Sequence, residues 1–367
     1  CGIGASILRN EDDRHLHGRG EFLADIVLPD LQEVAFLRSP FAHARILGIE
    51  SPGEAVSTVF TSADFDNIKP IRAIAGASGF KASDYPALAI DKVRFVGEPV
   101  AMCIAPSRAQ AEDLAQDIFL DLDELTAVVD MEQALDADAI RVHDHWDDNL
   151  YLETKINEGD IAAAKAAASI TVTRHYRMNR HAAVPLEGRG VLAYWDRRAN
   201  ELVIYSSTQF PHVIRTALAD CLGIEERKIR VVAPDVGGGF GVKNNLQPEE
   251  IAIAALAMRV DYPVRWVEDR REHLLASAHA RDHRYWVTAY ADEKGAILGV
   301  EAKIMVDAGA YSVWPWTAAM EAGMSAGILT GPYDITNYHA RVMTVATNKS
   351  PLGPYRGVGR TGACFAI

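Results

Sequence analysis

A run of glycines near the middle of the chain could bind a ligand through backbone groups. Ile229–Lys243 reads IRVVAPDVGGGFGVK, in which β-branched residues typical of a buried strand precede the glycines. A helix-like segment with Pro248 near its first turn follows. A turn between a strand and a helix leaves N–H groups free for an anion, especially a phosphate. Phe240 stands out within it, because a bulky ring must either pack against protein or face a ligand.

The common phosphate-binding motifs fit this turn poorly. A Walker loop needs Gly before its Lys and Ser or Thr after it, whereas Lys243 lies between Val242 and Asn244. A dinucleotide fingerprint needs G-x-G-x-x-G, but the spacing here is G-G-G-F-G, and the next acidic residue after a strand-like run is Glu268. For the glycine cluster alone, a tight turn without a ligand is the favoured interpretation. Other segments decide between the two.

Gln209 is a second candidate. Two predicted strands, Val191–Trp195 and Leu202–Ser206, precede it, and a predicted helix, Val213–Leu222, follows. The end of a strand before a helix is a common place for functional side chains. The alternative is that the glutamine only satisfies nearby backbone groups.

A loop near the C-terminal end, Pro351–Arg360, reads PLGPYRGVGR. Its glycines allow close approach of the backbone, and Arg356 and Arg360 supply permanent positive charge. The alternative is a pair of loop arginines in ordinary salt bridges.

Together these segments resemble the molybdenum hydroxylases, the xanthine oxidase family. GGGFGVK resembles the molybdopterin loop, YSSTQFPHVIRTALADCLGI the segment with a glutamine beside the metal, and PLGPYRGVGR the active-site arginine loop. The opening, IGASILRNEDDRHLHGRGEFLADI followed by LRSPFAHARILGIE, resembles the start of the family's large subunit. The matches run in order from Ile3 to Arg360, which makes the resemblance specific.

The resemblance implies an α+β fold in two parts. Residues 1–135 are expected to form an α/β hammerhead-like domain, and residues 161–367 the first molybdopterin-binding domain. Residues 136–160 are acidic and irregular, which predicts a solvated linker. Within the first part we expect a helix from Arg108 to about Phe119 and a strand at Leu125–Val129.

The resemblance also assigns roles in the site. Backbone N–H groups of the turn would bind the pterin, and a side chain at Gly238 or Gly239 would occupy the space that the pterin approaches. Gln209 would order an oxygen on molybdenum, Phe240 would form a wall, and Arg356 would stabilise charge on the substrate. No side chain ligates the metal, because the pterin dithiolene holds it. The cofactor-binding set is Gln209, Gly237, Gly238, Gly239, Phe240, Gly241 and Arg356.

Partners follow from the same resemblance. The family's general base is a glutamate in a second molybdopterin-binding half, so we expect either a second subunit that carries it or a fragment of a longer chain. The four cysteines, Cys1, Cys103, Cys221 and Cys364, include no CxxC pair, so iron–sulfur clusters and FAD are expected on partner subunits. The expected assembly is a cytoplasmic dimer of heteromers that holds molybdenum–molybdopterin, in plain or cytosine-dinucleotide form.

The expected reaction is hydroxylation of an aromatic N-heterocycle with oxygen from water. Purine hydroxylases carry a glutamate where this chain has Asn244, and the carbon-monoxide branch carries a cysteine where it has Gly357. Trp314 and Trp316 can be surfaces of a pocket or a packed corner. Aldehyde oxidation is the alternative reaction, and a non-catalytic scaffold with decayed loops is the alternative of another class.

Composition and residue spacing argue against several other classes of protein and site. The formal charge of −13 argues against a nucleic-acid surface, and no apolar run is long enough to span a membrane. His15, His17 and His43 lack the spacing of helical metal ligands and are interpreted as surface or structural residues. His181 and Glu187 resemble a family segment near the pocket, but a surface pair is the simpler interpretation, and neither is assigned a catalytic role.

Overall fold

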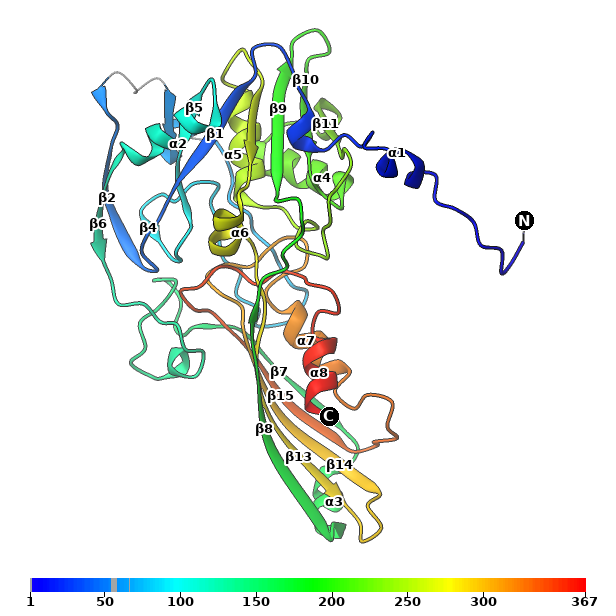
Figure 1. Cartoon of the computed structure of the whole chain (residues 1–367). Helices are drawn as coiled ribbons and strands as arrows, with labels where there is room; N and C mark the ends of the chain where they lie inside the picture. The colour runs from blue at the N-terminus through cyan, green and yellow to red at the C-terminus, as the bar shows by residue number, and fades with distance from the viewer. Residues whose placement is uncertain (1, 54–57, 66) are drawn as a thin grey trace.

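The computed structural model describes residues 2–53, 58–65 and 67–367 (Figure 1). It is a mixed α+β fold built around three sheets. The largest sheet has seven strands, which in spatial order are β11 (Ile229–Val232), β10 (Glu201–Ser206), β9 (Gly190–Asp196), β12 (Val264–Val267), β1 (Gln32–Arg38), β5 (Pro99–Ala105) and β3 (Val59–Thr61). Cys1, one of the four cysteines considered above, lies outside the described residues.

The seven-stranded sheet joins the two parts of the chain that the sequence separates. β1 pairs in parallel with β12, Gln32 opposite Val264, so strands from residues 1–135 and 161–367 form one continuous sheet. The predicted strand pair, β9 and β10, is confirmed as an antiparallel hairpin. The two parts are therefore not independent layers, and the boundaries at residues 135 and 161 stay a prediction.

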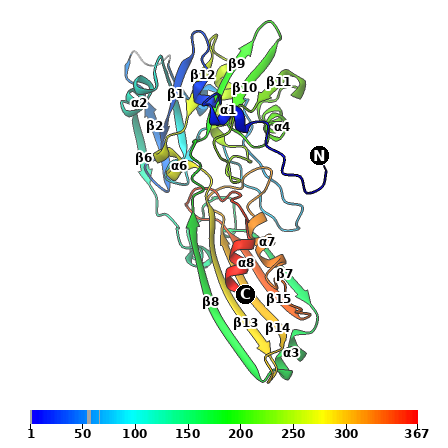
Figure 2. The same ribbon diagram turned by 45° about the vertical axis from the view of Figure 1, so that its right-hand side comes forward.

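A second sheet of five strands extends away from the first as a long blade (Figures 1 and 2). Its order is β7 (Leu150–Glu158), β15 (Tyr338–Val345), β14 (Ile297–Asp307), β13 (Ala280–Ala291) and β8 (Ile170–His181). Three helices contact these strands: α3 (Ile161–Ala167), α7 (Met320–Gly327) and α8 (Arg360–Ala366). β8 leads from the far end of the blade back to the seven-stranded sheet.

The third sheet belongs to the N-terminal part. It consists of β4 (Lys92–Val93), β2 (Ala44–Glu50) and β6 (Phe119–Glu124). Helix α2 (Arg108–Gln116) begins after Ser107, whose hydroxyl accepts a hydrogen bond from the N–H of Gln110, as its capping sequence predicts. Its small residues Ala111 and Ala115 pack in one apolar cluster with β1 and β5.

Three helices lie around the seven-stranded sheet and its loops: α4 (Pro211–Leu222), α5 (Pro248–Ala257) and α6 (Arg270–Ala276). Helix α1 (Asp12–Leu16) belongs to the N-terminal arm, and short 3-10 turns occur at Leu23–Asp25, Ser62–Asp64, Gln133–Leu135 and Glu226–Lys228. Every residue of α5 is buried, so it forms the centre of the core rather than an amphipathic cover. Because α4 and α5 follow β10 and β11, their first turns fix where the preceding loops end.

The prediction that residues 136–160 are a solvated, irregular linker is wrong. It contains β7, which pairs antiparallel with β15, and the side chains of His143, Trp146 and Asn149 are buried. Two of its acidic residues form ion pairs with lysines of the N-terminal part: Asp144 with Lys92 and Asp148 with Lys81. A strand partner far along the chain is not visible in local composition.

The strand expected at Leu125–Val129 is also wrong. α2 ends at Gln116, earlier than expected, and β6 has already ended at Glu124. The backbone beyond it bonds to loop residues and not to a neighbouring strand: the carbonyl of Thr126 lies 2.7 Å from Nδ1 of His43, and the N–H of Val128 donates to the side chain of Asn348 at 2.9 Å. β3 occupies Val59–Thr61, and residues 54–57 before it lie outside the described ranges.

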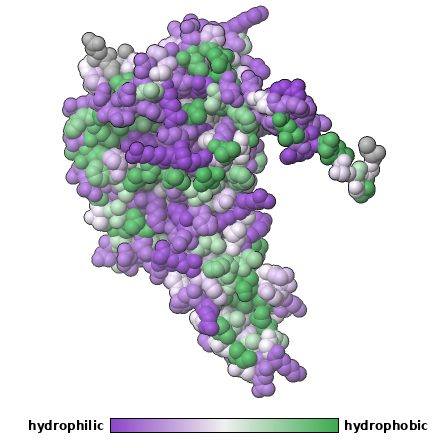
Figure 3. Space-filling view, viewed as in Figure 1, coloured by the Kyte–Doolittle hydropathy of each residue, from purple (hydrophilic) through white to green (hydrophobic). Residues whose placement is uncertain are grey.

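The first residues form an arm that projects from the body, with apolar side chains exposed along it (Figure 3). Arg14 and the N–H of Glu21 bind the carboxylate of Asp235, which anchors the base of the arm beside the glycine run. None of the helices among the described residues is long and apolar enough to cross a membrane.

Candidate cofactor site

The glycine run forms an irregular turn between β11 and α5. Gly238, Phe240 and Gly241 have φ values of 96°, 54° and 108°, a region that glycine enters freely and phenylalanine rarely. Two internal bonds close the turn: the N–H of Val242 donates to the carbonyl of Gly239 at 3.0 Å, and that of Asn244 to Gly241 at 3.1 Å. A residue with positive φ amid glycines indicates a conformation held by its surroundings.

The glycines are required first by contacts with protein. A Cβ on Gly239 would lie 2.5 Å from Oε1 of Gln209, and one on Gly241 would lie 2.7 Å from the carbonyl oxygen of Pro354. A side chain at Gly239 would therefore meet Gln209 first, and the expectation that it would also occupy the space of the pterin stays a prediction. A Cβ on Gly238 would meet the Phe240 ring and Pro185.

Three consecutive amides of the turn are free to bind a ligand. The N–H groups of Gly238, Gly239 and Phe240 have no hydrogen-bond acceptor within the described ranges, whereas those of Gly237 and Gly241 are bonded to side chains. Successive N–H groups in a turn with mixed φ signs form a concavity that suits anionic or acceptor-rich groups. This donor set fits a phosphate-bearing pterin.

Gln209 lies over this turn with its amide orientation fixed. Its backbone N–H donates to the carbonyl of Lys243 at 2.8 Å, and Oε1 accepts from the N–H of Gly241 at 2.9 Å. Because only the oxygen of an amide accepts, Nε2 must face the other way. Nε2 has no partner in the described part of the chain, and the side chain is exposed, so it can donate to an oxygen of a ligand.

The arginine loop meets the glycine turn directly. The N–H of Arg356 donates to the carbonyl of Phe240 at 2.8 Å, and the carbonyl of Arg356 accepts from the buried Arg281 at 2.8 Å. Arg281 is itself held by Glu321 at 2.7 Å. The guanidinium of Arg356 is exposed and makes no ion pair with any described residue, unlike most arginines of the chain. The structure thus brings together all the residues that the resemblance groups.

Aromatic rings stand next to Gln209. The Phe210 ring lies 6.2 Å from that of Trp316, whose Nε1 donates to the backbone and side-chain oxygens of Asn244 at 3.1 and 3.0 Å. Trp314 instead packs against the core, and its carbonyl accepts from the N–H of Leu246. Of the two tryptophans, Trp316 therefore lies at the site, and Trp314 is partly buried against the core.

Behind the turn lies a buried network of opposite charges. Arg189 donates to Glu268 at 2.6 Å and to Glu249 at 2.9 Å. Burial alone would raise the pKa of Glu268, but the charge of Arg189 and the hydrogen bonds from His273 and Arg189 hold it well below its usual range. Glu250 forms no ion pair with a described residue, and burial raises its pKa to about 7.

Sequence reasoning missed the role of Glu187. Its carboxylate lies 2.7 Å from Nζ of the buried Lys243 and accepts from the N–H of Gly237 at 2.7 Å, so it is part of the turn and not a surface residue. A lysine within an apolar and glycine-rich run requires a carboxylate partner, which is the one available signal. That signal does not say which of the chain's acids provides it.

The other candidates stay outside the site. His43 is buried against the carbonyl of Thr126, and His17 contacts the carbonyl of Asp13 within the arm. Residues 2–53, 58–65 and 67–367 contain no group of three or more His, Cys, Asp or Glu that could hold a metal ion. The positions of His43, buried against backbone, and of His17, in the arm, fit their interpretation as structural and surface residues.

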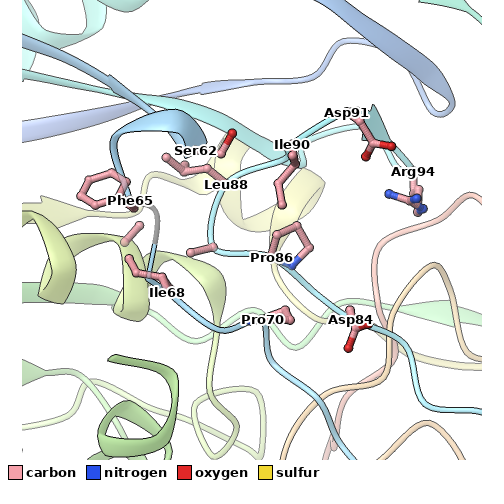
Figure 4. Close-up of a pocket in the computed structure, with 12 residues that line it drawn as sticks. Ser62, Phe65, Ile68, Pro70, Asp84, Pro86, Leu88, Ile90, Asp91 and Arg94 are labelled. Atoms are coloured by element: carbon pink, nitrogen blue, oxygen red, sulfur yellow. The ribbon is translucent and has the colours of Figure 1, made fainter. Parts of the chain in front are cut away.

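A cavity of about 250 Å³ lies apart from the turn (Figure 4). It is lined mainly by apolar side chains of the N-terminal part, including Phe65, Ile68 and Leu88, with Asp84, Asp91 and Arg94. It shares no lining residue with the glycine turn or the arginine loop. A cavity alone does not indicate a function, and the candidate functional residues lie at the glycine turn and the arginine loop.

Known protein families match both parts of the chain. Residues 17–126 match the "Aldehyde oxidase and xanthine dehydrogenase, a/b hammerhead domain", and residues 142–367 match the "Molybdopterin cofactor-binding domain".

Individual relatives are similar over almost the whole chain. The nicotine 6-hydroxylase large subunit of Paenarthrobacter nicotinovorans is 39% identical over 99% of this chain and 45% of its own length. The carbon monoxide dehydrogenase large chain of Hydrogenophaga pseudoflava is 33% identical over 96% of this chain and 46% of its own. The crystal structure of quinoline 2-oxidoreductase from Pseudomonas putida 86 superposes with a TM-score of 0.95 at 39% identity, over 99% of this chain and 47% of that one. This chain spans about half the length of these relatives.

Proposed function

Since the chain belongs to the molybdopterin-binding family of aldehyde oxidase and xanthine dehydrogenase, we propose that it is the part of a molybdenum hydroxylase that binds the pterin and orients the metal's oxygen ligand. The observation that carries this proposal is the fixed amide of Gln209 beside three unpaired N–H groups of the turn. When bound, the cofactor supplies a metal-activated oxygen derived from water and accepts two electrons.

The residues of this chain then bind the cofactor and orient the reacting groups. The N–H groups of Gly238, Gly239 and Phe240 hold acceptor atoms of the cofactor. Gln209 donates from Nε2 to an oxygen. The unpaired guanidinium of Arg356 stabilises negative charge that grows on the reacting group, and it does so most strongly if water is excluded. The Phe240 ring forms a wall of the space between the two loops.

An aromatic N-heterocycle is the proposed substrate. Phe210 and Trp316 offer flat apolar surfaces beside Gln209. Asn244, whose side-chain oxygen accepts a hydrogen bond from Trp316, brings no charge to this region. Relatives named for nicotine and quinoline add support to this substrate class. Carbon monoxide dehydrogenase is similar in sequence too, but the arginine of this chain is followed by Gly357, which offers no thiolate to a second metal.

The proposed assembly is a cytoplasmic complex. A second molybdopterin-binding half, on another chain or farther along the same one, carries the glutamate base, and iron–sulfur and FAD subunits remove the electrons. The exposed side chains of Leu186, Phe210 and Phe240 around the turn leave an apolar rim that such a half can cover.

The test uses the complex purified from its native host. We expect turnover of a quinoline- or nicotine-type substrate in water labelled with oxygen-18 to place the label in the product. Label from dissolved oxygen gas, or turnover of aldehydes alone, would reject the proposed reaction or substrate class. A complex without molybdenum and without activity would favour the non-catalytic scaffold.

A further inference from the structure

Glu187 lies in the segment between β8 and β9 and contacts both ends of the glycine turn. Its N–H donates to the carbonyl of Gly237 at 3.1 Å, and its carboxylate oxygen Oε2 accepts from the N–H of Gly237 at 2.7 Å. The same oxygen lies 2.7 Å from Nζ of Lys243. A single oxygen therefore binds the first glycine of the turn and the lysine that closes it.

The fit at this contact leaves little room for another arrangement. A Cβ on Gly237 would lie 2.5 Å from the Cβ of Glu187, and the side chain of Lys243 is 0% exposed. Among the described residues, Glu187 is the one carboxylate within ion-pair distance of this lysine. Its other oxygen, Oε1, is buried without a partner there, so the hydrogen bonds of the carboxylate with the turn are all made by Oε2.

The pair is needed because the lysine is buried. Burial lowers the pKa of Lys243, and the hydrogen bond and charge of Glu187 oppose that shift. Removing the carboxylate alone would leave a buried ammonium without a counter-charge, which must then lose its proton or move toward water. Either change releases the end of the turn.

Lys243, at the end of the glycine turn, also positions Gln209. The carbonyl of Lys243 accepts from the N–H of Gln209 at 2.8 Å and from the hydroxyl of Thr208 at 3.1 Å. We propose that Glu187 is a positioning residue: by holding Gly237 and Lys243, it fixes the free amides of the turn and sets the place of the Gln209 amide. The expected effect on turnover rests on the proposed function. The contacts of Glu187 with Gly237 and Lys243, called the clamp below, are made within this chain and need no cofactor.

Two substitutions separate charge from shape. Glu187→Gln keeps an oxygen for Gly237 and Lys243 but removes the negative charge, whereas Glu187→Ala removes both. Glu225→Gln is a matched control, because that carboxylate also pairs with a basic residue, Arg227, but is exposed and forms no ion pair with a residue of the turn in the described part of the chain. Lys243→Met combined with Glu187→Gln removes both charges and should lose less than the sum of the two single changes.

The complete complex is measured in two ways. Hydrogen–deuterium exchange should be faster at residues 237–244 in Glu187→Ala, with β9 and β10 unchanged. The kcat should fall by roughly tenfold in Glu187→Gln and roughly a hundredfold in Glu187→Ala, with KM within about twofold, since small misplacement of an orienting group costs that much. Glu225→Gln should match the parent in both measurements.

Parent-like exchange of the turn in Glu187→Ala would overturn the clamp. A fall in activity no larger than the fall in folded protein would overturn positioning and leave Glu187 a stabilising residue only. Faster exchange of the turn in a protein that contains no molybdopterin would uphold the clamp while rejecting the proposed function, so the two failures are distinguishable.

Discussion

At the scale of single residues, Gln209 carries two contacts that can be separated. Oε1 binds the N–H of Gly241, and Nε2 is free to donate to a ligand oxygen. Gln209→Glu keeps an acceptor for Gly241 but replaces the donor, whereas Gln209→Ala removes both. We expect both variants to lower kcat by about 10- to 1,000-fold, the usual cost of losing one oriented donor. Steady-state kinetics with molybdenum analysis checks this, and near-parent turnover in Gln209→Glu would mean that the donor has no role.

A second test at this scale compares substitutions of Arg356 and Arg360. Both are exposed, but only Arg356 bonds its backbone to Phe240 and is fixed from behind by Arg281. Arg356→Ala should lower kcat more than it raises KM, because charge stabilisation that develops during reaction is lost selectively. Arg356→Lys should recover part of the rate, and Arg360→Ala should have a small effect. Equal, small effects at both positions would make Arg356 an ordinary loop residue.

At the scale of elements, the sequence was sufficient to find the turn, Gln209 and the arginine loop, because each is a local pattern beside a strand or helix. It was not sufficient for contacts between distant segments. Glu187 meets Gly237 across 50 residues of sequence, β7 pairs with β15 although the two are far apart in the sequence, and β1 pairs with β12 and so joins the two parts of the chain. These pairings depend on chain topology, which local composition does not encode.

The turn as an element yields a prediction about Gly239. Its Cβ direction points at Gln209, and its φ is not in the left-handed region, so alanine strains contacts and not the backbone. Gly239→Ala should displace the Gln209 side chain and reproduce the kinetic defect of Gln209→Ala. The double variant should then be no worse than either single one. Additive losses would show that Gly239 acts independently of the glutamine.

At the scale of the whole molecule, buried polar contacts link the N-terminal part to the loop that follows β14 of the blade. Glu98, before β5, accepts from the hydroxyl of Tyr311 at 2.7 Å, and Tyr311 stacks on Tyr85 at 4.3 Å. Burial raises the pKa of Glu98 to about 7, above the 4.5 of an exposed glutamate. Between these values the folded state binds more protons than the unfolded state, so this carboxyl makes stability fall as pH rises.

Glu98→Gln should remove this dependence while retaining an acceptor for Tyr311. The variant should resemble the parent near pH 5 and be more stable at pH 8, by at most about 3 kcal/mol at about 1.4 kcal/mol per pKa unit. Chemical denaturation across pH 5–8 measures it. A difference that does not change with pH would mean that Glu98 does not titrate in this range.

The central claim is that the glycine turn and Gln209 bind a pterin cofactor and an oxygen of its metal. The structure of the complete complex from its native host, determined at a resolution that shows the cofactor, tests it most directly. We expect acceptor atoms of the cofactor within hydrogen-bond distance of the N–H groups of Gly238, Gly239 and Phe240, with Nε2 of Gln209 facing an oxygen. A turn that contacts only protein, or a cofactor bound elsewhere, would contradict it.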